Sequence, residues 1–137
     1  MSLVLDASAT LAWLLPEELT GAIAAAFDLI ADDCAWVPSL WRIEVANSLS
    51  VKLLRGRITP QRRREFLDDL KLLPIYYDQE TNDHVWDRTL ELADRHQLTV
   101  YDATYLELAL RLSLPLATLD DDLRQAAQRE GVPLLGK

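Results

Sequence analysis

The chain has 137 residues, 50% hydrophobic and 26% charged, which fits one globular domain spanning residues 1–137. Its net charge of −8 argues against a protein that holds nucleic acid mainly through a basic surface. The single cysteine, Cys34, excludes an intramolecular disulfide. With no secretory signal and no apolar run near the ~20 residues that cross a membrane, we expect a cytoplasmic protein with no membrane contact.

Short β-like runs alternate with longer helical patterns along the chain. In order, the predicted elements are a strand at 3–5, helices at 8–15 and 18–31, a strand at 35–37, a helix capped by Ser39 and running to 54, a helix opened by Thr59 and Pro60, a strand at 75–77, helices at 81–96 and 99–112, a strand at 116–119, a helix at 121–129 and a strand at 132–135. Because strands that alternate with helices form parallel sheets, the pattern predicts an α/β fold with a mostly parallel central sheet.

Two aspartates directly follow predicted strands. Asp6 ends the strand at 3–5, and Asp120 ends the strand at 116–119. Ligands of open parallel sheets bind beyond the carboxyl ends of the strands, so both side chains lie at one functional edge if these strands are neighbours. Each aspartate also precedes a predicted helix, and a helix cap is the alternative interpretation.

Glu44 is the least ordinary acid of the chain. It falls beyond the first turn of the helix predicted to start at Ser39, so helix capping does not explain it. Helical spacing places it on a largely apolar stripe with Leu40, Asn47, Val51 and Leu54. A buried carboxylate is costly unless it is paired, so we expect a metal ion or a basic partner, with Asn47 orienting Glu44 from one turn away.

Asp102 stands three residues after Thr99, the predicted cap of its helix. It is therefore either a metal ligand or the second half of a capping box, a position that prefers Glu or Gln. The two histidines, His84 and His96, form no ligand motif, and both are predicted to lie at the surface. A site made only of carboxylates suits Mg²⁺ or Mn²⁺ and suits zinc poorly.

Four stretches of the chain, in this order, resemble one known family. They are Val4-Leu-Asp-Ala-Ser, Pro38-Ser-Leu-Trp-Arg-Ile-Glu-Val-Ala-Asn, Leu98-Thr-Val-Tyr-Asp-Ala-Thr-Tyr-Leu-Glu-Leu-Ala and Leu114-Pro-Leu-Ala-Thr-Leu-Asp. With these flanks the chain resembles the PIN-domain ribonucleases, and more narrowly the VapC-type toxins of prokaryotic toxin–antitoxin pairs. The resemblance covers nearly the whole sequence.

The resemblance implies a three-layer α/β/α domain that hydrolyses RNA with Mg²⁺ or Mn²⁺. By position, the acidic metal-binding and catalytic quartet is Asp6, Glu44, Asp102 and Asp120. Ser8 and Thr118 match supporting hydroxyl positions. Asp121 and Asp122 leave open which of the three consecutive acids reaches the metal. The family also implies a small antitoxin that covers the active site, and a homodimer.

Other functions match these residues less well. An aspartate-nucleophile phosphatase needs a second Asp where Ser8 stands, and a receiver domain needs a late lysine that the chain lacks. A catalytically silent partner that only binds an antitoxin in a DNA-bound repressor complex is the remaining alternative. A run of arginines is either a basic face for RNA or a solvated helix face: Arg55, Arg57, Arg62, Arg63 and Arg64.

Overall fold

A five-stranded sheet forms the centre of the computed structural model, which describes residues 1–137. The strands are β1 (Leu3–Leu5), β2 (Ala35–Val37), β3 (Ile75–Tyr77), β4 (Leu116–Ala117) and β5 (Leu134–Leu135), in the order β3-β2-β1-β4-β5. All four strand pairs are parallel, and Val4 of β1 aligns with Trp36 of β2 and Leu116 of β4. The predicted parallel sheet is confirmed, and β1 and β4 are neighbours.

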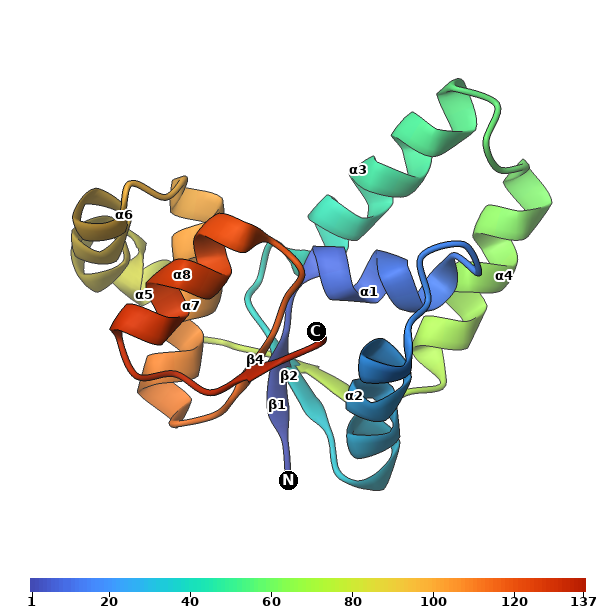
Figure 1. The fold of residues 1–137 in the computed structure, drawn as a ribbon. Helices are drawn as coiled ribbons and strands as arrows, with labels where there is room; N and C mark the ends of the chain where they lie inside the picture. The colour runs from blue at the N-terminus through green and yellow to red at the C-terminus, as the bar shows by residue number, and fades with distance from the viewer.

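Helices cover the sheet from two sides. One side carries α1 (Ala7–Leu14), α2 (Gly21–Asp32), α3 (Trp41–Leu54) and α4 (Pro60–Lys71). The other side carries α5 (Thr81–His84), the π-helical turn η1 (Val85–Thr89), α6 (Leu90–His96), α7 (Val100–Leu112) and α8 (Asp121–Arg129). Figure 1 shows the first group to the right of the sheet and the second to the left, which is the predicted three-layer α/β/α arrangement.

A topological switch point lies between the neighbouring strands β1 and β4, because the helices that follow them lie on opposite sides of the sheet. The chain leaves β1 toward the helices of one side, and it leaves β4 toward α8 on the other side (Figure 1). Crevices at the carboxyl ends of two such strands are where open α/β sheets bind their ligands. The side chains that follow β1 and β4 therefore occupy the position at which a site is expected.

Two helices begin later than predicted. α2 starts at Gly21 instead of residue 18, because the hydroxyl of Thr20 accepts a hydrogen bond from Ile23 N–H (3.2 Å) and so caps the helix. α3 starts at Trp41, and the predicted cap Ser39 instead donates its backbone N–H to Thr81 Oγ1 (3.2 Å). Thr59 and Thr99 cap their helices as predicted.

The central strand β1 is buried on both faces, which explains its uninterrupted apolar sequence, whereas Tyr76 of the edge strand β3 is 51% exposed. Leu3, Val4 and Leu5 have no exposed surface, as expected for a parallel strand between two helical layers. On one side Trp13 of α1 stacks on Phe27 of α2, with ring centroids 4.5 Å apart.

No helix combines the length and the apolar character needed to cross a membrane.

Candidate active site

Asp6 stands directly after β1 and is only 4% exposed. Its Oδ1 accepts hydrogen bonds from Ala9 N–H (2.9 Å) and from the Ser8 hydroxyl (2.7 Å), and its Oδ2 accepts one from Thr118 Oγ1 (2.5 Å). Burial is the main cause that raises the pKa of Asp6 to about 6, against the lowering effect of these hydrogen bonds. The side chain is therefore oriented firmly while its charge is poorly compensated.

Ser8 and Thr118 join the two halves of the switch point. Each hydroxyl donates to Asp6 and accepts from the segment after β4, because Leu119 N–H donates to Ser8 Oγ (2.9 Å) and Asp120 N–H donates to Thr118 Oγ1 (3.1 Å). A hydroxyl has one proton to donate and two lone pairs to accept, so each group acts as donor and acceptor at once. These contacts tie Asp6 and Asp120 to one frame.

Asp6 and Asp120 are also helix caps, as the alternative interpretation expected. Asp6 caps α1 through Ala9 N–H, and Asp120 caps α8 through Leu123 N–H (2.9 Å). In each cap one carboxylate oxygen, Oδ1, accepts the backbone hydrogen bond. Capping therefore fixes the direction of both side chains, and it is compatible with a second role at the edge of the sheet.

The prediction about the surroundings of Glu44 was wrong in two respects. Because α3 begins at Trp41, Glu44 lies in its first turn, where the helix dipole alone favours a carboxylate. The buried face of α3 consists of Trp41, Val45 and Leu49 and not of the predicted stripe, whose Leu54 is 86% exposed. Asn47 is exposed and makes no hydrogen bond to Glu44, so nothing in the structure supports an orienting role for it.

Tyr105 is the residue that orients Glu44, and sequence reasoning assigned it no role. Its ring is 1% exposed, and its hydroxyl donates to Glu44 Oε1. Tyr105 lies one turn after Asp102 on α7, so both project from the same face of that helix. A tyrosine three residues after a candidate acid was the available signal, but only the structure reveals its partner on α3.

The four predicted acids form one electrostatic group. Burial comes first among the causes that raise the pKa of Asp102 to about 6, followed by the charges of Asp120, Asp6 and Glu44. The charge of Asp120 also raises the pKa of Asp6. Asp102 itself makes half of a capping box, since its N–H donates to Thr99 Oγ1 (3.1 Å). Residues from β1, α3, α7 and α8 thus act on one another at this edge.

No cation compensates this group. None of the four acids forms an ion pair with a lysine, arginine or histidine. The two other strongly buried acids, Asp78 and Glu107, behave differently, because Arg111 binds both of them at 2.6 and 2.8 Å. His96 was predicted at the surface, but its side chain is 4% exposed and contacts Glu130 (2.6 Å), so it is a structural residue.

As the side chains stand, no three histidine, cysteine, aspartate or glutamate residues form a group that would hold a metal ion. Mutual repulsion gives a reason, since two carboxylates about 4 Å apart repel by roughly 4 kcal/mol at an effective dielectric near 20. The donor set nevertheless fits a hard divalent cation, because it offers only oxygen atoms and carries unpaired negative charge. Metal binding by the quartet remains a prediction.

The neighbouring acids point away from this group. Asp121 is exposed and pairs with Lys137 (2.8 Å), which lowers its pKa, and Asp122 is exposed as well. Of the three consecutive acids, only Asp120 is half-buried and acts on Asp6 and Asp102. These contacts favour Asp120 as the member of the quartet.

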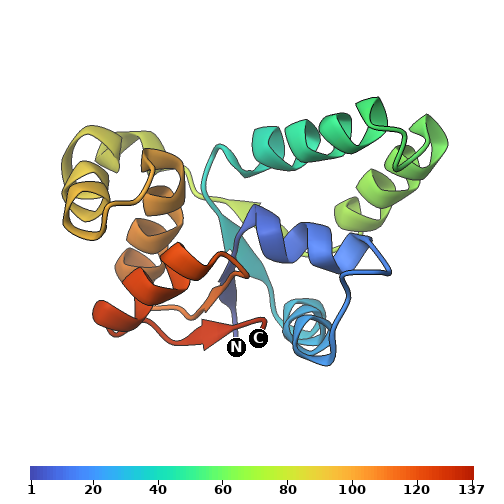
Figure 2. The same ribbon diagram turned by 45° about the horizontal axis from the view of Figure 1, so that its top comes forward.

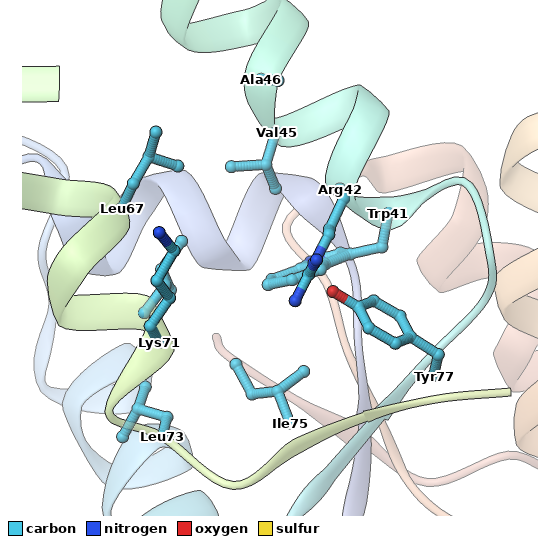
Figure 3. Close-up of a pocket in the computed structure, with 10 residues that line it drawn as sticks. Trp41, Arg42, Val45, Ala46, Leu67, Lys71, Leu73, Ile75 and Tyr77 are labelled. Atoms are coloured by element: carbon cyan, nitrogen blue, oxygen red, sulfur yellow. The ribbon is translucent and has the colours of Figure 1, made fainter. Parts of the chain in front are cut away.

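The best-defined apolar pocket of the molecule lies elsewhere and lacks acids. It has a volume of about 330 Å³ between α3, α4 and β3, and Figure 3 shows Arg42 beside Tyr77 at its rim. The Arg42 guanidinium lies 4.5 Å from the centre of the Tyr77 ring. The pocket is lined by Trp41, Arg42, Val45, Ala46, Leu67, Leu70, Lys71, Leu73, Ile75 and Tyr77. Its chemistry is that of a contact surface and not of a reaction centre.

Comparisons with known proteins agree on one family. The family model described as the PIN domain matches residues 3–129. The chain is 34% identical over 133 residues to ribonuclease VapC3 of Pyrobaculum aerophilum, which covers 91% of this chain and 94% of that protein. Two solved structures share the fold. PAE2754 from Pyrobaculum aerophilum has a TM-score of 0.66 and 21% identity over 98% of this chain and 89% of its own. FitAcB from Neisseria gonorrhoeae has a TM-score of 0.62 and 22% identity over 98% of this chain and 96% of its own.

We predict that Tyr105→Phe destabilises the metal-free protein, because Glu44 Oε1 loses its donor in a half-buried site. The expected loss in the free energy of unfolding is about 1–3 kcal/mol, measured by urea denaturation. Tyr101→Phe is the matched control on the same helix, since Tyr101 is 65% exposed and its hydroxyl makes no hydrogen bond. Equal stability of the two variants would contradict the assignment.

The raised pKa of Asp6 predicts a pH-dependent stability in the metal-free protein. A carboxyl group with a higher pKa in the folded state binds its proton more tightly there, so its stabilisation is full below about pH 4 and is lost as the pH rises through about 6. Between pH 4 and pH 7, the free energy of unfolding should therefore fall by up to about 3 kcal/mol less in Asp6→Asn than in the parent protein. Denaturation curves in chelator test this.

The matched control for that experiment is Asp122→Asn, which neutralises an exposed acid near the same edge. It should leave the pH profile of the free energy of unfolding as in the parent protein. If Asp6→Asn and the parent show the same profile, ionisation of the buried Asp6 does not lower the free energy of unfolding.

Proposed function

Because this chain belongs to the PIN-domain family, we propose that it is a divalent-metal-dependent endoribonuclease that acts as the toxin of a toxin–antitoxin pair. The observation that carries the proposal is the group of four carboxylates at the switch point, which has no cation of its own. A buried cluster of like charges costs stability, and a binding site for Mg²⁺ or Mn²⁺ explains why it is kept.

Each of the four acids has a distinct role in this proposal. Asp6 is held by two hydroxyls and by Ala9 N–H, and Asp120 caps α8 and acts on Asp6 through its charge. Tyr105 occupies Oε1 of Glu44, so Oε2 is left for a ligand. Asp102 supplies the fourth carboxylate, whose pKa is raised by burial and then by the charges of the other three acids. Together these residues would hold the ion and a phosphodiester beside it.

A divalent ion bound there would activate water and stabilise the charge that develops on the phosphodiester during in-line displacement. The chain's own contribution is orientation. The hydroxyls of Ser8 and Thr118 fix the orientation of the Asp6 carboxylate, and the hydroxyl of Tyr105 fixes that of the Glu44 carboxylate. Ser8 and Thr118 are supporting residues in this scheme and do not touch the substrate.

Membership of the VapC-type group supports further partners. The curated relative is named as a ribonuclease, and we infer an RNA substrate, a small antitoxin that covers the site, a homodimer and a cytoplasmic location. The alternative is a silent protein that only binds its antitoxin in a DNA-bound repressor complex. RNA cleavage that a chelator abolishes would separate the enzyme from that alternative.

We expect Asp6→Asn and Glu44→Gln each to lower metal-dependent RNA cleavage by about 100-fold or more while the fold is retained, because each removes one charged ligand. Cleavage of mixed RNA oligonucleotides with Mg²⁺ or Mn²⁺ gives the rate, and circular dichroism reports the fold. Asp122→Asn is the control and should cleave at the parent rate. A Glu44→Gln protein as active as the parent would exclude Glu44 as a ligand.

We also expect millimolar Mn²⁺ to raise the melting temperature by several degrees, because a ligand that binds only the folded state at 100 times its Kd adds about 2.7 kcal/mol. The shift should shrink in Asp6→Asn and Glu44→Gln and persist in Asp122→Asn. Differential scanning fluorimetry measures it without any catalytic step. The absence of a shift in the parent protein would count against metal binding by the four acids.

A further inference from the structure

The positive charge of this acidic protein is concentrated on one part of the fold. We call α3, α4 and the loop between them, residues 41–71, the helical arm. Figures 1 and 2 show it extending away from the sheet on the side of α1. Eight of the fourteen cations lie on it: Arg42, Lys52, Arg55, Arg57, Arg62, Arg63, Arg64 and Lys71. It has four acids, so the arm carries +4 and the rest of the chain −12.

The cations of the helical arm are almost all free of ion pairs. Arg62 alone pairs with a carboxylate, Glu65 at 2.8 Å. Outside the arm four of six cations are paired with acids, namely Arg88, Arg95, Arg111 and Lys137. Arg42 and Arg62 lie over aromatic rings, and Arg63 donates to Ser50 Oγ (3.3 Å). The charges of Lys52, Arg55 and Arg57 make no such contact, so they are available to an anionic partner.

Three of these cations surround a hollow close to the acid group. Lys52, Arg55 and Arg57 line a hollow of about 240 Å³ together with Leu11, Asn47, Ser48 and Val51. Leu11 belongs to α1, the helix that Asp6 caps. Lys52 follows Glu44 by eight residues, which is about 12 Å along α3 at 1.5 Å per residue. A few nucleotides of a single strand span that distance.

The hollow offers more than charge. Asn47 is exposed, and its side-chain amide makes no hydrogen bond within the protein. Ser48 is half-buried beside it and contributes a hydroxyl. Amide and hydroxyl groups donate to phosphate and sugar oxygens alongside Lys and Arg in nucleic-acid complexes. Between α3 and α4, Arg63 and Arg64 line a second hollow of about 390 Å³.

We propose that the helical arm, through Lys52, Arg55 and Arg57, binds the phosphates of the RNA strand that enters or leaves the acid group. The inference rests on the proposed function for the identity of the polyanion. The acid group itself repels an RNA strand, so an enzyme with a body charge of −12 needs a separate attractive surface beside it. The arm is the part of the fold that supplies one.

Binding can be measured without cleavage. The parent for this experiment is the Asp6→Asn protein in chelator, and the probe is a labelled single-stranded RNA of about 12 nucleotides, followed by fluorescence anisotropy in about 50–300 mM KCl. The test variant adds Lys52→Gln, Arg55→Gln and Arg57→Gln. The matched control adds Arg88→Gln, Arg129→Gln and Lys137→Gln, which removes the same charge outside the arm.

We expect the test variant to bind RNA at least about 10-fold more weakly near 100 mM salt. The slope of log K against log salt should fall by about 2, since each phosphate contact on a single strand contributes roughly 0.7. The control should keep both the affinity within about 3-fold and the slope. The double variant Arg55→Gln, Arg57→Gln changes only exposed side chains and should show about two-thirds of the change in slope.

Other results would overturn the proposal. Equal losses in the test and control variants would mean that only net charge matters, and no RNA binding by the parent would exclude the surface. Polyglutamate bound by the arm as tightly as RNA would assign the surface to an acidic protein segment. If the arm variants lose RNA binding but the unmutated protein shows no metal-dependent cleavage, the proposed function alone is wrong. If the unmutated protein cleaves RNA but the arm variants bind it as tightly as their parent, this inference alone is wrong.

Discussion

Uncompensated negative charge at the carboxyl ends of β1 and β4 is the constraint on which the rest of this structure depends. Asp6 is buried after β1, and the charges of Asp120 and Glu44 act with its own on Asp102. Such a group persists only because hydrogen bonds from Ser8, Thr118 and Ala9 N–H hold Asp6 in place. Burial of these charges costs stability, and under the proposed function a bound divalent cation would restore it.

The fold separates charges that would otherwise cancel. Elsewhere in the molecule buried acids pair with an arginine, as Asp78 and Glu107 pair with Arg111, whereas no cation of the helical arm forms an ion pair with the four acids. The two regions remain connected, since Tyr105 on α7 donates to Glu44 at the base of the arm. Figure 2 shows that α3 and α7 lie on opposite sides of the sheet, so this hydrogen bond links the two helical layers.

Predictions from local pattern succeeded where local physics decides the outcome. The strands at 3–5, 35–37 and 75–77 have the predicted bounds, because each is an uninterrupted run of apolar or aromatic residues. Thr59 and Thr99 cap their helices, because a hydroxyl reaches only its own first turn. The same reasoning failed at Ser39, whose backbone N–H is taken by Thr81, a residue 42 positions away. The prediction that Glu44 lies on an apolar stripe was wrong as well.

The sequence by itself determined the parallel α/β fold, the family and the order of the four acids, because strand, cap and motif signals are carried by adjacent residues. Only the tertiary structure decided which groups meet. It joined Thr118 to Asp6 and Tyr105 to Glu44, turned Asp121 toward Lys137, and left all the cations of the arm except Arg62 without an ion pair. Hydrogen bonds and ion pairs depend on distances in space, and residues separated by 61 or 112 positions carry no local sign of their partners.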